Sequence, residues 1–184
     1  FGFYLSFAAD NDSGEFTVNG YDSQRTSGPM TYEPLNSNGG YWQFSVSQGG
    51  FSAGSSTGQF GAITSAIADT GTSLIQLPTP MAQSIWTAIN ATPIPSQAGS
   101  ASIDCNAQSP DVVFTFSNTP YAIPASAYIL PNGDGTCLCG FTGGSDPTSQ
   151  DPSPVAIFGD VFLRVWYSHY DVKGLRVGKF FFGL

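Results

Sequence analysis

Apolar side chains recur at every second position in four stretches of the chain, and this alternation most limits the folds open to it. The stretches are bounded by Gly, Asn, Ser and Pro and cover residues 1–7, 14–20, 41–46 and 111–116. A period of two places apolar side chains on one face of a β-strand, whereas an amphipathic helix needs a period of 3.6. The sequence therefore predicts an all-β protein of short strands, with turns supplied by its 22 Gly and 13 Pro.

Helical periodicity is clear in one place, after Thr79-Pro80. Met81, Ile85 and Ile89 recur at i, i+4 and i+8, so they share one face of a helix and are predicted to face the core. Thr79 is expected to cap this helix, and Pro80 is expected to occupy its first position.

A second, shorter helix is expected over residues 161–164, with Asp160 as its N-cap. No linker composition or internal repeat divides the chain, and 184 residues suffice for one sizeable core. The sequence therefore predicts a single domain over residues 1–184 that is all-β apart from one or two short helices.

Charged residues are scarce, and acids outnumber bases. They make up 10% of the chain, against about 25% in ordinary soluble proteins, and 13 acids face five Lys and Arg for a net charge of −8. Nucleic-acid binding is not expected, because phosphate contacts need a clustered basic surface.

No run approaches the roughly 18–20 apolar residues that cross a membrane, so no membrane partner is expected. So few bases also limit positive self-repulsion at low pH, which suits an acidic environment.

One Asp-Thr-Gly occurs, at residues 69–71, between the small and apolar residues of 62–68 and the polar pair Thr72-Ser73. A carboxylate between a buried strand and a glycine-containing turn is poorly solvated. Its charge must be held by hydroxyl and backbone N–H donors, or it must share a proton with a second acid. Asp69 is therefore a carboxylate that needs specific partners, and ordinary turn chemistry is one explanation for Thr70 and Thr72.

An apolar strand that ends in glycine is the second landmark, at Val155-Ala156-Ile157-Phe158-Gly159. Glycine has no Cβ, so another backbone segment can pass very close to it. Together with Asp69-Thr70-Gly71, this strand resembles the one that crosses behind the catalytic loop in each lobe of the pepsin-like aspartic proteases. Further segments keep the order and approximate spacing of that family: 3–6, 40–44, 121–124, 157–164 and 176–178.

The resemblance covers essentially the whole chain, and it is a resemblance to the C-terminal lobe alone, of the fungal type. It implies one lobe of the acid protease fold, with a ψ-shaped crossing of the catalytic loop and the apolar strand. The N-terminal lobe is absent from these residues. In the family, two aspartates, one from each lobe, share a proton and hold the attacking water. Asp69 is the only residue here that matches.

The same resemblance implies roles for the neighbours of Asp69. Thr70 would hydrogen-bond across the lobe interface, and the hydroxyl of Thr72 would hold the carboxylate. Substrate would be contacted by Ile67, Gly71, Ser73 and Ile157. Core packing is the alternative for the two isoleucines.

The resemblance implies an aspartic endopeptidase lobe that hydrolyses peptide bonds at acid pH without a cofactor, in a secreted or vacuolar compartment. Its partners would be an N-terminal lobe with the second Asp-Thr-Gly and peptide or protein substrates, and the lone chain would be inactive. Asn11 and Asn90 begin sequons that would accept glycans in a secreted protein. Two alternatives stay open: a homodimeric protease with one Asp69 per chain, and a non-catalytic lobe that binds or regulates.

Three cysteines cannot all pair within the chain, and Cys137-Leu138-Cys139 lacks the spacing and the second ligand pair of a zinc site. With His169 as the only histidine, no metal site is expected. The resemblance pairs Cys105 with Cys137 and leaves Cys139 as a free, buried thiol. Three reduced core cysteines in a cytosolic protein are the alternative.

Overall fold

Short strands dominate the structure, a computed structural model that describes residues 1–7, 12–26, 30–36, 40–61, 63–146 and 155–181. The strands are β1 (Gly2–Tyr4), β2 (Glu15–Thr17), β3 (Thr31–Pro34), β4 (Gln43–Ser45), β5 (Gly50–Ala53), β6 (Ser56–Gln59), β7 (Ser65–Ala68), β8 (Ile75–Leu77), β9 (Thr92–Pro93), β10 (Ala101–Ile103), β11 (Val112–Phe116), β12 (Thr119–Ile123), β13 (Ile129–Pro131), β14 (Cys137–Cys139), β15 (Phe141–Gly143), β16 (Val155–Phe158), β17 (Trp166–Asp171) and β18 (Arg176–Phe181). The helices are α1 (Thr79–Ile89), α2 (Ala125–Tyr128) and α3 (Asp160–Leu163), with a 3-10 helix η2 at Ser23–Arg25. The all-β prediction is confirmed, and α2 is the helix that the sequence did not predict. None of the helices in the described segments is long and apolar enough to span a membrane.

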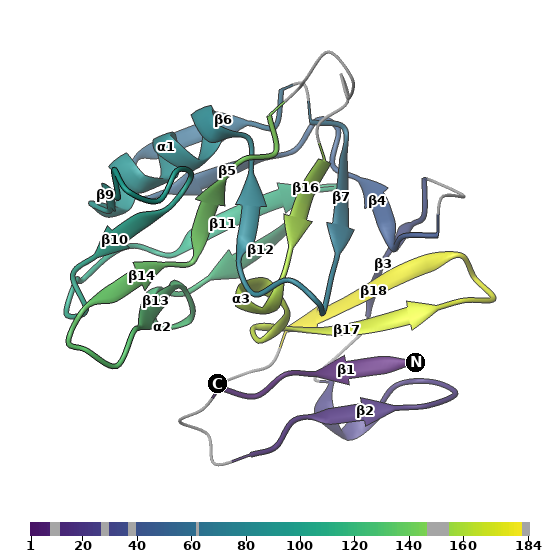
Figure 1. The fold of residues 1–184 in the computed structure, drawn as a ribbon. Coiled ribbons are helices and arrows are strands. Elements are labelled where there is room, and N and C mark those ends of the chain that lie inside the picture. The colour runs from purple at the N-terminus through teal and green to yellow at the C-terminus, as the bar shows by residue number, and fades with distance from the viewer. Residues whose placement is uncertain (8–11, 27–29, 37–39, 62, 147–154, 182–184) are drawn as a thin grey trace.

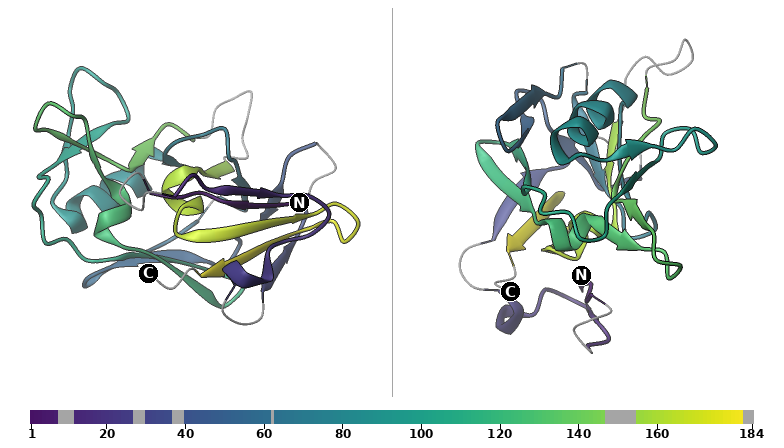
Figure 2. Two further views of the ribbon diagram at one scale, coloured as in Figure 1. Left: turned by 90° about the horizontal axis from the view of Figure 1, so that it is seen from below. Right: turned by 90° about the vertical axis from the view of Figure 1, so that its left-hand side faces the viewer.

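The described strands form four sheets (Figure 1). The sheet ordered β2-β1-β17-β18-β3, called the basal sheet below, is antiparallel throughout and lies beneath the rest of the chain in Figure 1. The sheet ordered β15-β8-β16-β7-β4, called the central sheet, mixes parallel and antiparallel pairs. Two further sheets are ordered β12-β11-β5-β6 and β13-β14-β10-β9, and α1 lies on the side away from the basal sheet (Figures 1 and 2).

Aromatic side chains fill the interior around β16. Phe158 is completely buried, with its ring centroid 5.1 Å from that of Phe114 on β11 and 4.8 Å from that of Phe162 on α3. Burying one phenylalanine side chain contributes about 1.5–3 kcal/mol. These contacts therefore hold the central sheet against β11 and α3 and fix the position where β16 ends.

The four alternating stretches each contain a strand, but the strands are shorter than the stretches. β2 covers only Glu15–Thr17 of residues 14–20. Left-handed backbone bounds it, with φ of 71° at Gly14 and 64° at Asn19. Such dihedrals do not fit a strand, so the chain turns even though the alternation continues.

The start of α1 differs from the prediction. Its N-cap is Pro78 rather than Thr79, so Pro80 is the second helical residue, and the N-cap itself offers no side-chain cap. Asp146, from a distant segment, takes this role: its carboxylate accepts the Thr79 N–H at 2.8 Å and also the Thr79 hydroxyl. A tertiary contact therefore replaces the local cap. The three residues predicted to face the core, Met81, Ile85 and Ile89, are buried, and Ala82 and Trp86 are buried with them.

The cysteines are arranged as expected. Cys105 and Cys137 form a disulfide across a sequence separation of 32 residues, and Cys139 is free and buried. Burial raises the pKa of the Cys139 thiol to about 11. Because the thiolate is the reactive form, this thiol is nearly inert at neutral pH.

Cys139 is expected to resist iodoacetamide in the folded protein near neutral pH and to react once the protein is unfolded. Peptide mapping without reduction should find Cys105 linked to Cys137, with label on Cys139 only after denaturation. A link between Cys105 and Cys139, with Cys137 alkylated, would refute the assignment.

Candidate active site

Three strands of the central sheet bring the Asp-Thr-Gly segment and the apolar-apolar-glycine strand together (Figure 1). β16 is parallel to β7, with Ile157 opposite Ile67, and antiparallel to β8. Asp69 directly follows β7, and its N–H donates to the Phe158 carbonyl at 3.1 Å. The ends of β7 and β16 are therefore joined where the motif begins.

Gly159 lies where a backbone crossing leaves no room for a side chain. A Cβ at this position would stand 2.1 Å from the Thr72 carbonyl oxygen. The next two residues close the crossing: Asp160 N–H donates to the Thr72 carbonyl at 2.8 Å, and Val161 N–H to the Ser73 carbonyl at 3.1 Å. The crossing expected from the sequence is present.

Each carboxylate oxygen of Asp69 has a donor within its own loop. Gly71 N–H donates to Oδ1 at 2.9 Å, and the Thr72 hydroxyl donates to Oδ2 at 2.6 Å. Two such bonds fix the plane of the carboxylate and give each of its oxygens a donor. The Asp69 side chain is only half-buried, so the site offers an oriented carboxylate to solvent.

The residues expected to contact substrate lie around this loop. Ile67 and Ile157 face each other in register and are both half-buried, so neither is sealed in the core. Thr70, Gly71 and Ser73 are exposed. The structure thus brings an apolar strip and an exposed backbone segment to the same end of β7 and β16.

Asp160 is the first residue of α3 and not its N-cap, which corrects the expectation from the sequence. The N-cap is Gly159, because the crossing requires glycine at the point where the helix begins. The Asp160 carboxylate lies 4.0 Å from the guanidinium of Arg164 instead.

The surroundings of Asp160 also connect it to the candidate site. Burial raises the pKa of the Asp160 carboxyl, Arg164 opposes this effect, and the negative charge of Asp69 adds to it. Sequence reasoning missed this electrostatic influence of Asp69 on Asp160. The position of Asp160 directly after the crossing glycine was the available signal.

The remaining candidates lie elsewhere. Asn90 is exposed and ends α1 in the left-handed conformation, with φ of 59°. Asn11 falls outside the described residues. His169 is a buried residue of β17, with Nδ1 2.9 Å from the Tyr32 hydroxyl oxygen. Across the described part of the chain, no three His, Cys, Asp or Glu residues are grouped so as to hold a metal ion.

Comparisons with known proteins agree on one family. A family model described as eukaryotic aspartyl protease matches residues 1–179. The chain is 37% identical over 183 residues to cathepsin E of Oryctolagus cuniculus, 39% over 181 residues to probable vacuolar protease A of Arthroderma benhamiae, and 34% over 180 residues to gastricsin of Oryctolagus cuniculus. Each match covers 97% of this chain but only 43–45% of the relative. The chain therefore spans less than half the length of these relatives.

Gly159→Ala is expected to destabilise the fold by at least about 3 kcal/mol, because the new Cβ would overlap a backbone carbonyl that cannot move freely. Gly133→Ala is the matched control: no atom lies within 4 Å of its added Cβ, but its φ is +84°. That variant should lose only about 1–2 kcal/mol, the cost of left-handed backbone. Urea unfolding curves would compare the two, and equal losses would contradict the proposed close approach at Gly159.

Proposed function

The chain belongs to the eukaryotic aspartyl protease family, and from this we propose that it is the C-terminal lobe of a two-lobed aspartic endopeptidase. In this proposal residues 1–184 form one domain and supply one of two catalytic aspartates. The observation that carries it is Asp69, held by Gly71 N–H and the Thr72 hydroxyl on the exposed side of the crossing. The coverage of less than half of each relative supports a partner lobe.

The proposed chemistry divides one proton between two carboxyl groups. Asp69 and the aspartate of the partner lobe would hold a water between them, with one carboxylate taking its proton as it attacks the scissile carbonyl. The other, protonated carboxyl would donate to the carbonyl oxygen. The loop donors keep Asp69 oriented through this exchange, and no cofactor is needed.

Substrate recognition on this side would use the half-buried strip of Ile67 and Ile157. An apolar strip of this kind favours a bulky apolar side chain next to the scissile bond. The exposed backbone at Gly71 and the side chain of Ser73 would contact the main chain of the peptide, and Thr70 would bond to the partner lobe. The proposed substrates are therefore peptides or proteins with apolar residues around the cleavage site.

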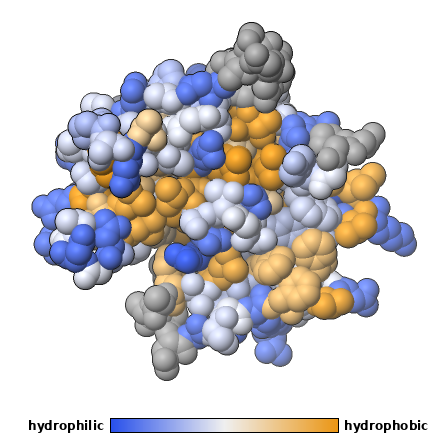
Figure 3. Space-filling model, viewed as in Figure 1, coloured by the Kyte–Doolittle hydropathy of each residue, from blue (hydrophilic) through white to orange (hydrophobic). Residues whose placement is uncertain are grey.

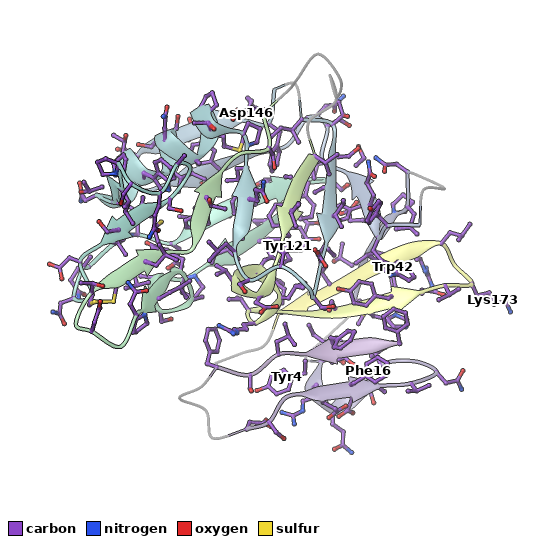
Figure 4. The ribbon with its side chains drawn as sticks, viewed as in Figure 1. Tyr4, Phe16, Trp42, Tyr121, Asp146 and Lys173 are labelled. Carbon is purple, nitrogen blue, oxygen red and sulfur yellow. A yellow bond between two sulfur atoms is a disulfide. The ribbon has the colours of Figure 1, made fainter. Side chains whose placement is uncertain are left out.

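An aromatic surface on the basal sheet supports a protein partner. Figure 3 shows apolar surface over β1 and β2, where Phe16 is 56% exposed. Half-buried Phe1 connects this surface to the core, with its ring centroid 4.9 Å from that of the buried Tyr170 and 5.5 Å from that of the half-buried Trp42. Figure 4 places Phe16 and Trp42 on either side of β1. Exposed apolar patches typically mark interaction sites, so we assign the partner lobe to this side.

An acidic secreted or vacuolar compartment is proposed for the enzyme. One relative is named a vacuolar protease, and a chain with five bases gains little positive charge at low pH. The disulfide and the exposed Asn90 sequon fit such a compartment. Similarity to both rabbit and fungal proteases does not single out the fungal members.

Asp69→Asn in the complete two-lobed protein is expected to reduce peptide hydrolysis by at least about 10²–10⁴-fold, because an amide cannot exchange the shared proton. The fold should survive, since the amide keeps the size of the carboxylate. Asp104→Asn, at an exposed position, is the control and should retain activity. A folded Asp69→Asn enzyme with near-normal turnover at acid pH would rule out the mechanism.

The 184-residue chain by itself is expected to fold but to cleave no peptide bond between about pH 2 and 7, where carboxyl groups exchange protons. One carboxyl cannot act as acid and base in the same step. The test is a denatured-protein substrate, with the mass of the chain in solution measured in parallel. Cleavage by a dimer would favour the homodimeric protease instead, and a complete protein that binds peptides without cleaving them would favour a non-catalytic role.

A further inference from the structure

A lysine is enclosed where the basal sheet meets the rest of the chain. Lys179 on β18 is 2% exposed, and Glu33 on the neighbouring strand β3 is also 2% exposed. Lys179 pairs with Thr31 and Val177 pairs with Glu33 in the antiparallel register, so the lysine and the glutamate are diagonal neighbours on one face. Lys and Glu are almost never fully buried without a partner. The proposed protease chemistry uses neither of them.

Aromatic rings from two other sheets surround the ammonium group. Lys179 Nζ lies 3.3 Å from the ring centroid of Phe44, 4.4 Å from that of Phe116 and 5.3 Å from that of Tyr121. Phe44 belongs to β4, and the other two rings belong to the hairpin of β11 and β12. Tyr121 lies in the middle of the molecule in Figure 4. Cation–π attraction strengthens when the cation is removed from water, so the rings favour a charged lysine here.

Glu33 reaches the same hairpin. Its Oε2 accepts the Ser117 hydroxyl at 2.6 Å, at the turn where Ser117 and Asn118 have left-handed φ of 50° and 60°. Within the described segments, Glu33 Oε1 and Lys179 Nζ are buried without a hydrogen-bond partner. The two charges therefore stabilise each other through space rather than through a direct bond.

We propose that Glu33 and Lys179 form a proton-sensitive latch that fastens the basal sheet to β4 and to the hairpin of β11 and β12. The latch bridges three sheets, since each of its members contacts an element outside the basal sheet. Its strength depends on the proton of Lys179: Glu33 offsets part of the cost of burying this proton, so the sheets are held most firmly when the lysine is neutral.

The direction of the pH effect follows from the surroundings of Lys179. Burial lowers the pKa of its ammonium well below the ordinary value of 10.5, and the negative charge of Glu33 opposes the shift. Of the other polar groups on the packed elements, burial raises the pKa values of Tyr121 and Tyr170, so both phenols stay neutral, and Ser168 does not titrate. The folded state thus binds the lysine proton less tightly than the unfolded state. The free energy of unfolding therefore rises as the pH increases from the pKa of Lys179 in the folded protein to its ordinary value of 10.5. Below the folded pKa, Lys179 is protonated in both states, and the folded state bears the full cost of burying the charge.

Lysine NMR tests the latch directly, because the chain contains two lysines, Lys173 and Lys179. Lys173 is exposed at the tip of the β17–β18 hairpin (Figure 4) and is the internal reference. In the full chain labelled with ¹³Cε-lysine, and with signals assigned by Lys173→Met and Lys179→Met, Lys179 should titrate at lower pH than Lys173. Glu33→Gln should lower the Lys179 midpoint further and leave that of Lys173 unchanged. Equal midpoints for the two lysines, or no response to Glu33→Gln, would overturn the proposal.

Thermal unfolding gives the second measurement. Glu33→Gln should lower the midpoint by on the order of 10 °C, because it leaves a buried ammonium without its counter-charge. Adding Lys179→Met to it should recover most of that loss, since no unpaired charge remains. Lys179→Met should also flatten the rise of stability with pH, whereas the control Lys173→Met should keep it. A double variant no more stable than Glu33→Gln alone would contradict the latch. If Glu33→Gln does not fold, the stability of the double variant and the lysine titration of the unmodified chain still test the latch.

Discussion

The crossing at Gly159 is the constraint on which the rest of the structure depends. Two backbone hydrogen bonds, from Asp160 to Thr72 and from Val161 to Ser73, join the start of α3 to the loop after Asp69, two segments that are far apart in the sequence. They can form only because glycine allows the two backbones to approach. The same contact sets the end of β16, the start of α3 and the loop that holds the Asp69 carboxylate. Phe158 and Phe162 pack against each other on the core side of this contact. One backbone contact therefore fixes both the packing around β16 and the position of the Asp69 loop.

Sequence predicted those features that local chemistry decides. The donors to Asp69 come from residues two and three positions later, so the motif itself contained the geometry of the carboxylate. The buried face of α1 followed from its periodicity. The ends of strands were harder to predict, because the left-handed backbone of Asn19 interrupts an alternation that continues in the sequence.

Several features that depend on distant contacts carried no local signal in the sequence. The cap of α1 comes from Asp146, which is 67 residues away from Thr79. The influence of Asp69 on Asp160 and the enclosure of Lys179 depend on how strands from separate parts of the chain are arranged. Lysine is usually solvent-exposed, and the sequence around Lys179 gives no sign that it is enclosed. Only the register of β18 against β3 turns it inward beside Glu33.

The cap supplied by Asp146 has a consequence for the order in which the chain folds. An isolated helix shorter than about 12–15 residues is marginal in water, and α1 has 11 residues. During synthesis, α1 emerges from the ribosome well before Asp146 does, so its first turn then lacks the carboxylate that later satisfies it. Closing a loop of this length costs entropy before the contact repays it. Helix α1 should therefore consolidate late, after β15 has paired with β8, even though its sequence is the most helical part of the chain.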